Sequence, residues 1–407
     1  MQNTQQSSQK KILRVVTFIF CEENYGQILQ AYALQRYLRN TYPEQYDVKV
    51  IWGMPVGFNK KAYLVHRILG NGIYELLRAC KRAIKPSQNE NLTILNMRKR
   101  RGFNEFKQKY IAVHSDSLQF YLFCTKHHYP ELQADVLITG SDQVWNDWGT
   151  APAESALGYE YSWLPYYTLE FAAPESKKIA YAASMGKREF NSAAHKAYFQ
   201  KALKDYAVIG VREQSNVDLL ASAGVESICV PDPTMLLTKA QWVELVDSSA
   251  LDLPNNLSQS IFIYTYGDER FGGDELPKIL GAHDEVIAVS SACDPDSNDN
   301  YNPTLQEWIA CIKGCKLMVS GSFHGACFAI MMNTPFFICR ISHQASESLN
   351  TRFENLVRIF GLEDRIVNSL EELQDKIAQN PPIDWELVNT RLAQWRKVGE
   401  EFLQKVL

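Results

Sequence analysis

The chain has 407 residues, which at about 150 residues per domain corresponds to two domains, or three if one is small. Hydrophobic residues make up 46% and charged residues 22%, as in globular proteins, so disorder, collagen-like repetition and a coiled coil are excluded. The net charge is -4, from 42 basic and 46 acidic residues. The molecule as a whole therefore does not bind polyanions, no nucleic-acid partner is expected, and any phosphate site must be local.

Residues 1–11 are polar and rich in glutamine, without an apolar core of signal-peptide length, and we interpret them as a disordered lead-in. No run of about 18 apolar residues occurs, so no membrane-spanning segment is expected. The nine cysteines are scattered and form no CxxC pair. This pattern favours reduced thiols in a cytoplasmic protein over a disulfide framework or a zinc site.

Short β-branched or aromatic runs alternate with segments of helical period along the whole chain, which predicts an α/β fold with parallel sheets and crossover helices. The strands expected in the first half are 15–20, 48–52, 136–139, 179–183, 208–211 and 228–230. Those expected in the second half are 260–264, 285–289, 317–320 and 336–339. The two sets predict two Rossmann-like domains.

The segment 251–259 is rich in Asn, Ser and Leu, contains a proline, and separates the two sets of strands as a linker or surface loop. We therefore expect an N-terminal domain over 12–240 and a C-terminal domain over 241–380. The tail 381–407 follows two prolines and predicts one helix that packs back on the body. Its apolar face would comprise Trp385, Val388, Leu392, Trp395, Phe402 and Val406.

Residues 60–109 contain thirteen Lys or Arg residues against three Glu. Within this segment, 66–85 has apolar residues at helical spacing and basic residues on the remaining surface. A basic amphipathic helix of this kind can lie on an anionic membrane face. An ordinary helix that covers the sheet and exposes a basic side has the same pattern, and the sequence does not separate the two.

In an open α/β sheet, ligands bind beyond the carboxyl ends of the strands, where helix amino termini also point their N–H groups. After the first strand, Asn24 is placed to cap the next helix, and Gly26 and Gln27 are candidate binding residues. After strand 136–139 comes a polar loop that suits a sugar, since carboxylate and amide groups bind hydroxyls and a ring stacks on the apolar face. The loop residues concerned are Ser141, Asp142, Gln143, Trp145 and Asn146. A turn that merely caps its own helix is the alternative.

The second half offers an anion site. Ser322 is a natural N-cap after strand 317–320, with Gly325 just inside the helix and His324 in its first turn, at the positive end of the helix dipole. Arg212 ends a strand of the first half. Arg340 and Arg352 follow the last strand and are further candidate anion partners, because a guanidinium matches carboxylate or phosphate.

Several of these residues lie in motifs that occur in the order of a known family. The motifs are Asn24-Tyr25-Gly26, the run 29–35, Gly140-Ser141-Asp142-Gln143-Val144-Trp145-Asn146, the run 180–184, Val211-Arg212-Glu213, Asp232-Pro233-Thr234, Ser322-Phe323-His324-Gly325, Arg352 and the run 361–365. Together they resemble the polysaccharide pyruvyl transferase family over about residues 12–370. The resemblance implies a GT-B-like fold, with two Rossmann-like domains facing each other across a cleft, and transfer of pyruvate from phosphoenolpyruvate to a pair of sugar hydroxyls as a cyclic ketal. It places the family's functional arginine on Arg212 and its functional histidine on His324.

The chain departs from many members of that family just before His324, where Gly321 and Ser322 stand in place of an aspartate and an arginine. Arg340 or Arg352 would then supply the missing anion contact. We expect His324 to act as an acid or on phosphate, Arg212 to bind an anionic group and Asp142 to contact an acceptor hydroxyl. The N-terminal domain would hold the acceptor and the C-terminal domain the donor.

No metal and no cofactor is expected beyond phosphoenolpyruvate as the donor substrate, because no cluster of carboxylates or histidines has metal spacing. The acceptor would be a saccharide of a bacterial surface polysaccharide, and the basic segment suggests the further hypothesis of a lipid-linked acceptor reached at the inner membrane face. Two alternatives remain open from the sequence: a glycosyltransferase that uses a nucleotide sugar, and a saccharide-binding protein without catalysis. The oligomeric state is not indicated.

Overall fold

The computed structural model describes residues 10–19, 21–51, 92–114, 133–146, 164–265, 276–295, 297, 299–340 and 350–407. The expected basic helix 66–85 and most of the expected lead-in 1–11 lie outside these ranges. Within the described residues, no helix is both long enough and apolar enough to cross a membrane.

Two all-parallel sheets organise the chain, which confirms the expected α/β fold class. The first has the order β3-β2-β1-β4-β5-β6-β7 and the second the order β12-β11-β10-β8-β9. The strands of the first sheet are β1 Lys11–Val16, β2 Tyr46–Ile51, β3 Val113–His114, β4 Val136–Thr139, β5 Lys177–Ala183, β6 Tyr206–Val211 and β7 Ile228–Cys229. Those of the second are β8 Ile261–Thr265, β9 Val286–Ser290, β10 Leu317–Ser320, β11 Phe336–Cys339 and β12 Ile366–Val367.

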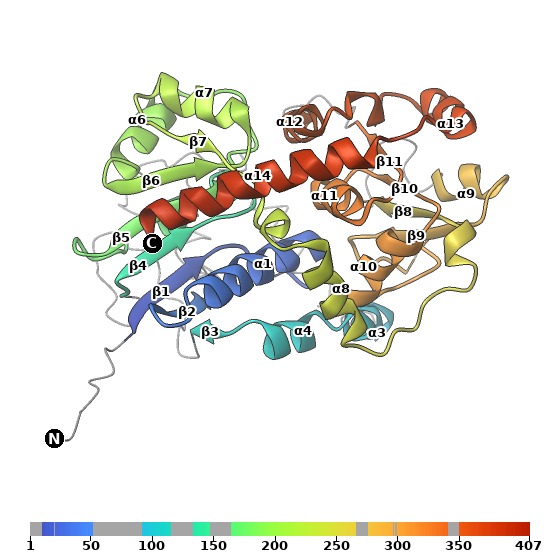
Figure 1. Cartoon of the computed structure of the whole chain (residues 1–407), viewed down its shortest axis with the longest axis horizontal. Coiled ribbons are helices and arrows are strands. Elements are labelled where there is room, and N and C mark those ends of the chain that lie inside the picture. The colour runs from blue at the N-terminus through green and yellow to red at the C-terminus, as the bar shows by residue number, and fades with distance from the viewer. Residues whose placement is uncertain are drawn as a thin grey trace, which may run out of the picture.

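Helices surround both sheets (Figure 1). Those that follow strands of the first sheet or cross to the second are α1 Tyr25–Thr41, α3 Leu92–Arg101, α4 Phe103–Tyr110, α5 Leu164–Tyr167, α6 Ala193–Ala202, α7 Gln214–Ser222 and α8 Lys239–Asp247. The later ones are α9 Leu276–Gly281, α10 Leu305–Gly314, α11 Phe323–Met332, α12 Thr351–Phe360, α13 Leu370–Gln379 and α14 Trp385–Val406. Short 3₁₀ turns lie at η2 Pro233–Leu236, η3 Leu257–Gln259 and η6 Glu363–Arg365.

Most expected strands are present, and three of them have the expected bounds: β4, β10 and β11. The first strand is shifted, because the apolar run 15–20 predicted its position whereas pairing with β2 begins at Lys11. The start of β1 is exposed, with Ile12 37% accessible, so hydropathy did not reveal it. The two-residue strands β3 and β12 were missed because they are too short for a periodic signal.

Helix α1 lies at the centre of the molecule and is buried over most of its length. The Asn24 side chain accepts a hydrogen bond from the Gln27 amide at 3.1 Å, which confirms the expected N-cap. Residues 25–35 are all buried, because α1 packs on the first sheet and also contacts α10 and α11 of the second half. This position brings the amino terminus of α1 to the junction of the two halves.

Helix α14 spans both halves, as the long red helix of Figure 1 shows, and contacts β6, α11 and α12. The expected apolar face is confirmed: Val388, Leu392 and Phe402 are buried, and the other three expected residues pack against the same core. The expected linker 251–259 contains no strand or α-helix, only the 3₁₀ turn η3.

Candidate active site

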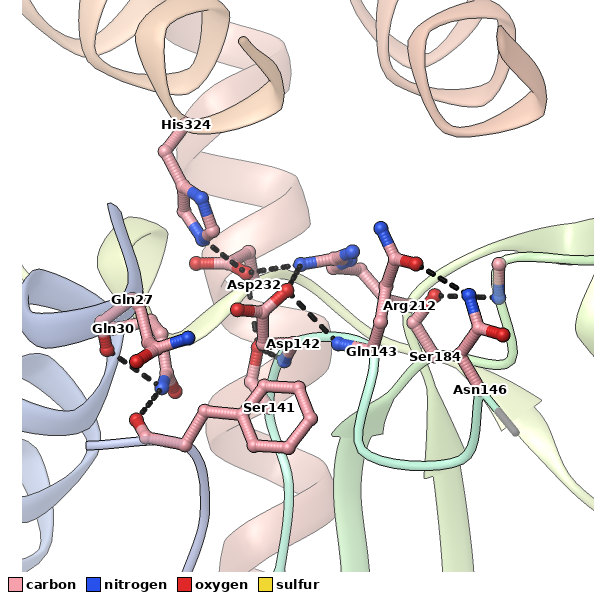
Figure 2. A network of polar contacts seen from close by, with 12 residues as sticks. Gln27, Gln30, Ser141, Asp142, Gln143, Asn146, Ser184, Arg212, Asp232 and His324 are labelled. Carbon is pink, nitrogen blue, oxygen red and sulfur yellow. Dashed lines mark hydrogen bonds and ion pairs between the residues drawn. The ribbon is translucent and has the colours of Figure 1, made fainter. Parts of the chain in front are cut away.

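The carboxylate of Asp232 lies where the carboxyl ends of the two sheets meet. It follows β7, and its Oδ1 accepts hydrogen bonds from Thr234 N at 3.0 Å and Thr234 Oγ1 at 2.8 Å. Its Oδ2 lies 3.0 Å from Ser141 Oγ, 3.3 Å from Arg212 Nη1 and 3.5 Å from His324 Nε2. Figure 2 shows these groups converging on Asp232 from β4, β6 and α11. The two catalytic candidates Arg212 and His324 are thus brought together, through a shared carboxylate.

The Arg212 guanidinium is buried, with a side chain only 1% exposed. Its Nε donates to Glu213 Oε1 at 2.9 Å, and Nη1 lies 3.9 Å from Asp142 Oδ1 in addition to its bond to Asp232. Its face stacks on the ring of Phe323, the first residue of α11, at 4.3 Å. Its Nη2 has no hydrogen-bond partner within the described part of the chain.

The imidazole of His324 is held between Asp232 and the bare backbone of Gly26. A Cβ added at Gly26 would lie 2.6 Å from His324 Cβ and closer still to Nδ1 and Cγ of the ring. The open face expected at Gly26 is therefore occupied by His324, and Gly26 contacts the catalytic candidate rather than presenting backbone to a ligand. Because His324 belongs to the second half while Gly26 and Asp232 belong to the first, its position depends on both.

In the loop after β4, Asp142, Gln143 and Asn146 lie beside the cluster, whereas Trp145 does not. Asp142 adopts a left-handed backbone conformation with φ of 71°, and its Oδ1 accepts from Gln143 N at 2.9 Å. The Gln143 side chain accepts from Asn146 Nδ2 at 2.7 Å, which ties the loop together beside Arg212 in Figure 2. Asp142 keeps 12% of its side chain accessible.

Trp145 does not fit the expected role of stacking on a sugar. It is fully buried, its Nε1 donates to Tyr167 O at 3.0 Å, and its ring packs against Phe199 and Tyr206. An aromatic side chain in a polar loop is typical of a sugar-binding site, but the prediction is wrong for Trp145, which anchors the loop in the core.

Two further expected groups have structural contacts of their own. Gln27 accepts from Cys21 N at 3.0 Å and lies next to Gln30 on the α1 side of the cluster. Ser322 accepts from Gly325 N at 3.2 Å, which confirms the expected N-cap of α11. A Cβ at Gly325 would lie 2.7 Å from Met318 Cε, so Gly325 allows α11 to pack closely on β10.

The two arginines that follow β11 differ in their surroundings. Arg340 is paired with Glu354 at 2.9 Å and keeps about a third of its side chain exposed. Arg352 is 8% exposed and stacks on Phe353. The positive charges of Arg352 and Arg212 both act to lower the pKa of the buried Cys327 thiol, against the dominant effect of burial, which raises it. Arg212 stacks on Phe323 at the start of α11, and Arg352 lies in the first turn of α12, which packs against α11.

The cluster holds more carboxylates than cations. Burial opposes the charged form of Asp232, but the contacts with His324 and with the Arg212 guanidinium outweigh it and hold the pKa of Asp232 well below its usual range. Burial would also lower the pKa of Arg212, yet the neighbouring carboxylates of Glu213, Asp232 and Asp142 raise it above its usual range. Arg212 is thus a permanent cation, and its three acidic neighbours offset its charge.

Three arginines in the described part of the basic segment 60–109 bond to other parts of the chain. Arg101 is fully buried and donates to Ser290 O at 3.0 Å and Ser291 O at 2.6 Å at the carboxyl end of β9. Arg100 pairs with Glu307 of α10 at 2.8 Å, and Arg98 pairs with Glu23 at 2.7 Å. These three guanidinium groups join parts of the chain to one another.

Within the described residues, no group of three or more His, Cys, Asp or Glu side chains is placed to hold a metal ion. A model of the family described as polysaccharide pyruvyl transferase matches residues 24–343, and this range contains every residue of the cluster. The chain belongs to the polysaccharide pyruvyl transferase family. Membership of this family indicates an enzyme that transfers a pyruvyl group to a polysaccharide.

The other comparisons are weaker. No curated protein matches the chain. A UDP-GlcNAc 2-epimerase from Neisseria meningitidis bound to UDP-GlcNAc is 11% identical, with a TM-score of 0.47, covering 97% of this chain and 100% of the other. The UDP-GlcNAc 2-epimerase of Methanocaldococcus jannaschii in complex with UDP-GlcNAc and UDP is 11% identical, with a TM-score of 0.44 and coverage of 91% and 92%. The N-terminal domain of Candida albicans trehalose-6-phosphate phosphatase is 11% identical, with a TM-score of 0.41 and coverage of 98% of both chains.

Asp232 is one of two carboxylates of this pyruvyl transferase family member that were not predicted as site residues. It was part of the motif Asp232-Pro233-Thr234, which follows an expected strand, and that position was the available signal. Glu213 was missed in the same way, although it adjoins Arg212. Both were passed over because a sequence does not show which carboxylate turns toward the partner domain.

Proposed function

We propose that this protein transfers the pyruvyl group of phosphoenolpyruvate to two hydroxyls of one saccharide unit, forming a cyclic ketal and releasing phosphate. The observation that supports this most is the meeting of Arg212 and His324, from different halves of the chain, at the carboxylate of Asp232. An acid–base group beside a fixed cation is what addition to an anionic enol phosphate requires.

The anionic groups of the donor need cationic or N–H partners. At the amino terminus of α11 the Ser322 and Gly325 N–H groups donate to Ser320 Oγ and Ser322 Oγ. The N–H groups of Phe323 and His324 have no intrahelical acceptor, and we propose them as donors to the substrate. Arg212 contributes Nη2, the end of its guanidinium that has no partner within the described residues. As the second guanidinium we propose Arg352, which is 8% exposed and lies at the start of α12, the helix that packs against α11.

In the proposed reaction, every proton and electron pair is supplied by the two substrates and by His324. Protonated His324 gives its proton to the methylene carbon of phosphoenolpyruvate, and the first sugar hydroxyl forms a bond to the adjacent carbon while its proton returns to the imidazole. The bond from that carbon to the phosphate oxygen then breaks and the phosphate leaves with the electron pair. The second hydroxyl attacks the same carbon, and its proton leaves with the phosphate. Asp232 orients the imidazole and stabilises its charged form throughout.

The experiment is release of phosphate from phosphoenolpyruvate in the presence of saccharide acceptors, with mass spectrometry of the acceptor to detect the added ketal. We expect release in the wild type and none in His324→Gln, which keeps the size of the side chain. A parallel incubation with nucleotide sugars that releases nucleotide and no phosphate would overturn the proposal in favour of a glycosyltransferase. Phosphoenolpyruvate that neither reacts nor raises the melting temperature would indicate saccharide binding alone.

A further inference from the structure

A groove of about 630 Å³ lies between helices of the two halves. One wall is the face of α7 from Gln214 to Ser222, and the other is the face of α12 from Thr351 to Arg358. Phe190, from the loop before α6, adds a half-buried aromatic ring. The volume is within the range of ligand-binding sites, and boundaries between domains are where such sites are most often found.

The groove starts next to the catalytic cluster. Helix α7 begins at Gln214, directly after Arg212 and Glu213. At this end Asn355 of α12 bridges the two halves, since its Oδ1 accepts from Gln214 N at 3.3 Å and its Nδ2 donates to Arg212 O at 3.4 Å. From there α7 continues for about 12 Å at its usual rise per residue. The groove therefore extends along α7 from a point two residues after Arg212 in the sequence.

The chemistry of the walls favours a neutral polyhydroxyl ligand. The groove has equal numbers of cationic and anionic side chains, namely Arg188, Lys196, Arg358, Glu189, Asp218 and Glu354. Opposite charges are paired across it, with Arg188 and Glu354 2.7 Å apart. A wall of this kind offers many donors and acceptors without the excess charge that selects a polyanion. The ring of Phe190 adds an apolar surface of the kind on which a sugar stacks.

We propose that this groove binds the saccharide chain that carries the acceptor sugar. This inference rests on the proposed function, because it assigns a second contact area to the same acceptor. It also explains how a small, buried catalytic cluster acts on a polysaccharide, since affinity for the polymer comes from the groove and chemistry from the cluster. The groove then affects the KM for long acceptors, and the cluster determines kcat.

The test uses two variants that fill the groove, Asp218→Trp and Ser222→Trp. Both positions are exposed and line the groove, so bulk there is tolerated by the core. The matched control is Ala221→Trp, which is exposed on the same helix but does not line the groove. Binding is measured on an array of unpyruvylated oligosaccharide fragments of bacterial exopolysaccharides, and KM and kcat are measured with a fragment that binds and with its monosaccharide.

We expect the two groove variants to lose oligosaccharide affinity and to raise the KM for the fragment by about tenfold or more, which is the loss of one good contact. With the monosaccharide their kcat and KM equal those of the wild type and the control. Wild-type binding retained in both variants, or absence of binding in the wild type, overturns the groove assignment. Failure of the proposed function is a different result, namely no phosphate released from phosphoenolpyruvate with any acceptor.

Discussion

Substitution of Gly26 by alanine tests whether His324 is held in its working position by contact between the two halves. The added methyl group would lie 2.6 Å from His324 Cβ and closer to the ring, whereas carbon atoms pack at about 3.5–4.0 Å. The imidazole must therefore move by about 1 Å, which alters its 3.5 Å approach to Asp232. Displacement of a reacting group by that amount costs about 10²-fold in rate.

The same substitution is expected to lower the free energy of unfolding by about 1–3 kcal/mol, the usual cost of overpacking a filled interior. Gly26 has no positive φ and lies in a helix, where alanine is favoured over glycine by up to about 1 kcal/mol. Any destabilisation therefore comes from the clash with His324. Phosphate release and urea unfolding measure the two effects.

A double-mutant cycle separates this contact from a general disturbance of α1. In a His324→Gly background the clashing atoms are gone, so Gly26→Ala should no longer destabilise. Gly281→Ala is the matched control, because the nearest atom to an added Cβ there is 3.9 Å away. An equal loss of stability in both backgrounds, or full activity in Gly26→Ala, would refute the positioning role of Gly26.

Further predictions concern charge in the cluster. Arg212→Ala should abolish phosphate release and also lower the free energy of unfolding by about 3–5 kcal/mol, because buried carboxylates lose their cation. His324→Ala should abolish phosphate release but leave the fold intact. Thermal unfolding of both variants checks this difference. The pKa of Asp232 is lowered in the folded state, so its contribution to stability is present above its unfolded pKa of about 3.9 and is lost as the pH falls toward the folded value. Urea unfolding against pH should show this acid loss in the wild type and a flatter acid limb in Asp232→Asn. Arg352→Gln should raise the KM for phosphoenolpyruvate more than Arg340→Gln does, and equal effects in steady-state kinetics would contradict the assignment of Arg352.

The fold was predictable because alternation of apolar runs and helical segments reports buried parallel strands directly, and β4, β10 and β11 have the expected bounds. The bounds of β1 were not predictable, because the register of β1 is determined by its pairing with β2 and β4 and because its first residues are exposed. Hydropathy reports burial, and it carries no information on which neighbour a strand pairs with.

The sequence indicated which positions lie in the candidate site better than it indicated which side chains contact one another there. Arg212 and His324 were identified because they follow strands, where loops gather at one edge of a parallel sheet. The role of Asp232 as the shared partner, the contact of Gly26 with His324 and the burial of Trp145 all depend on how one half is oriented on the other. No local pattern encodes that orientation.

The contacts of helix α3 with the second half affect whether the chain can be divided into two separate polypeptides at the linker. Arg101 belongs to the first half by sequence, yet its guanidinium is covered by carbonyl groups of the second. Expressed alone, the first half would leave that charged group without its acceptors, and the second would lose the donors that saturate the end of β9. A split at 251–259 is therefore expected to yield aggregation-prone fragments, and co-expression of both pieces is the arrangement in which they would complement each other.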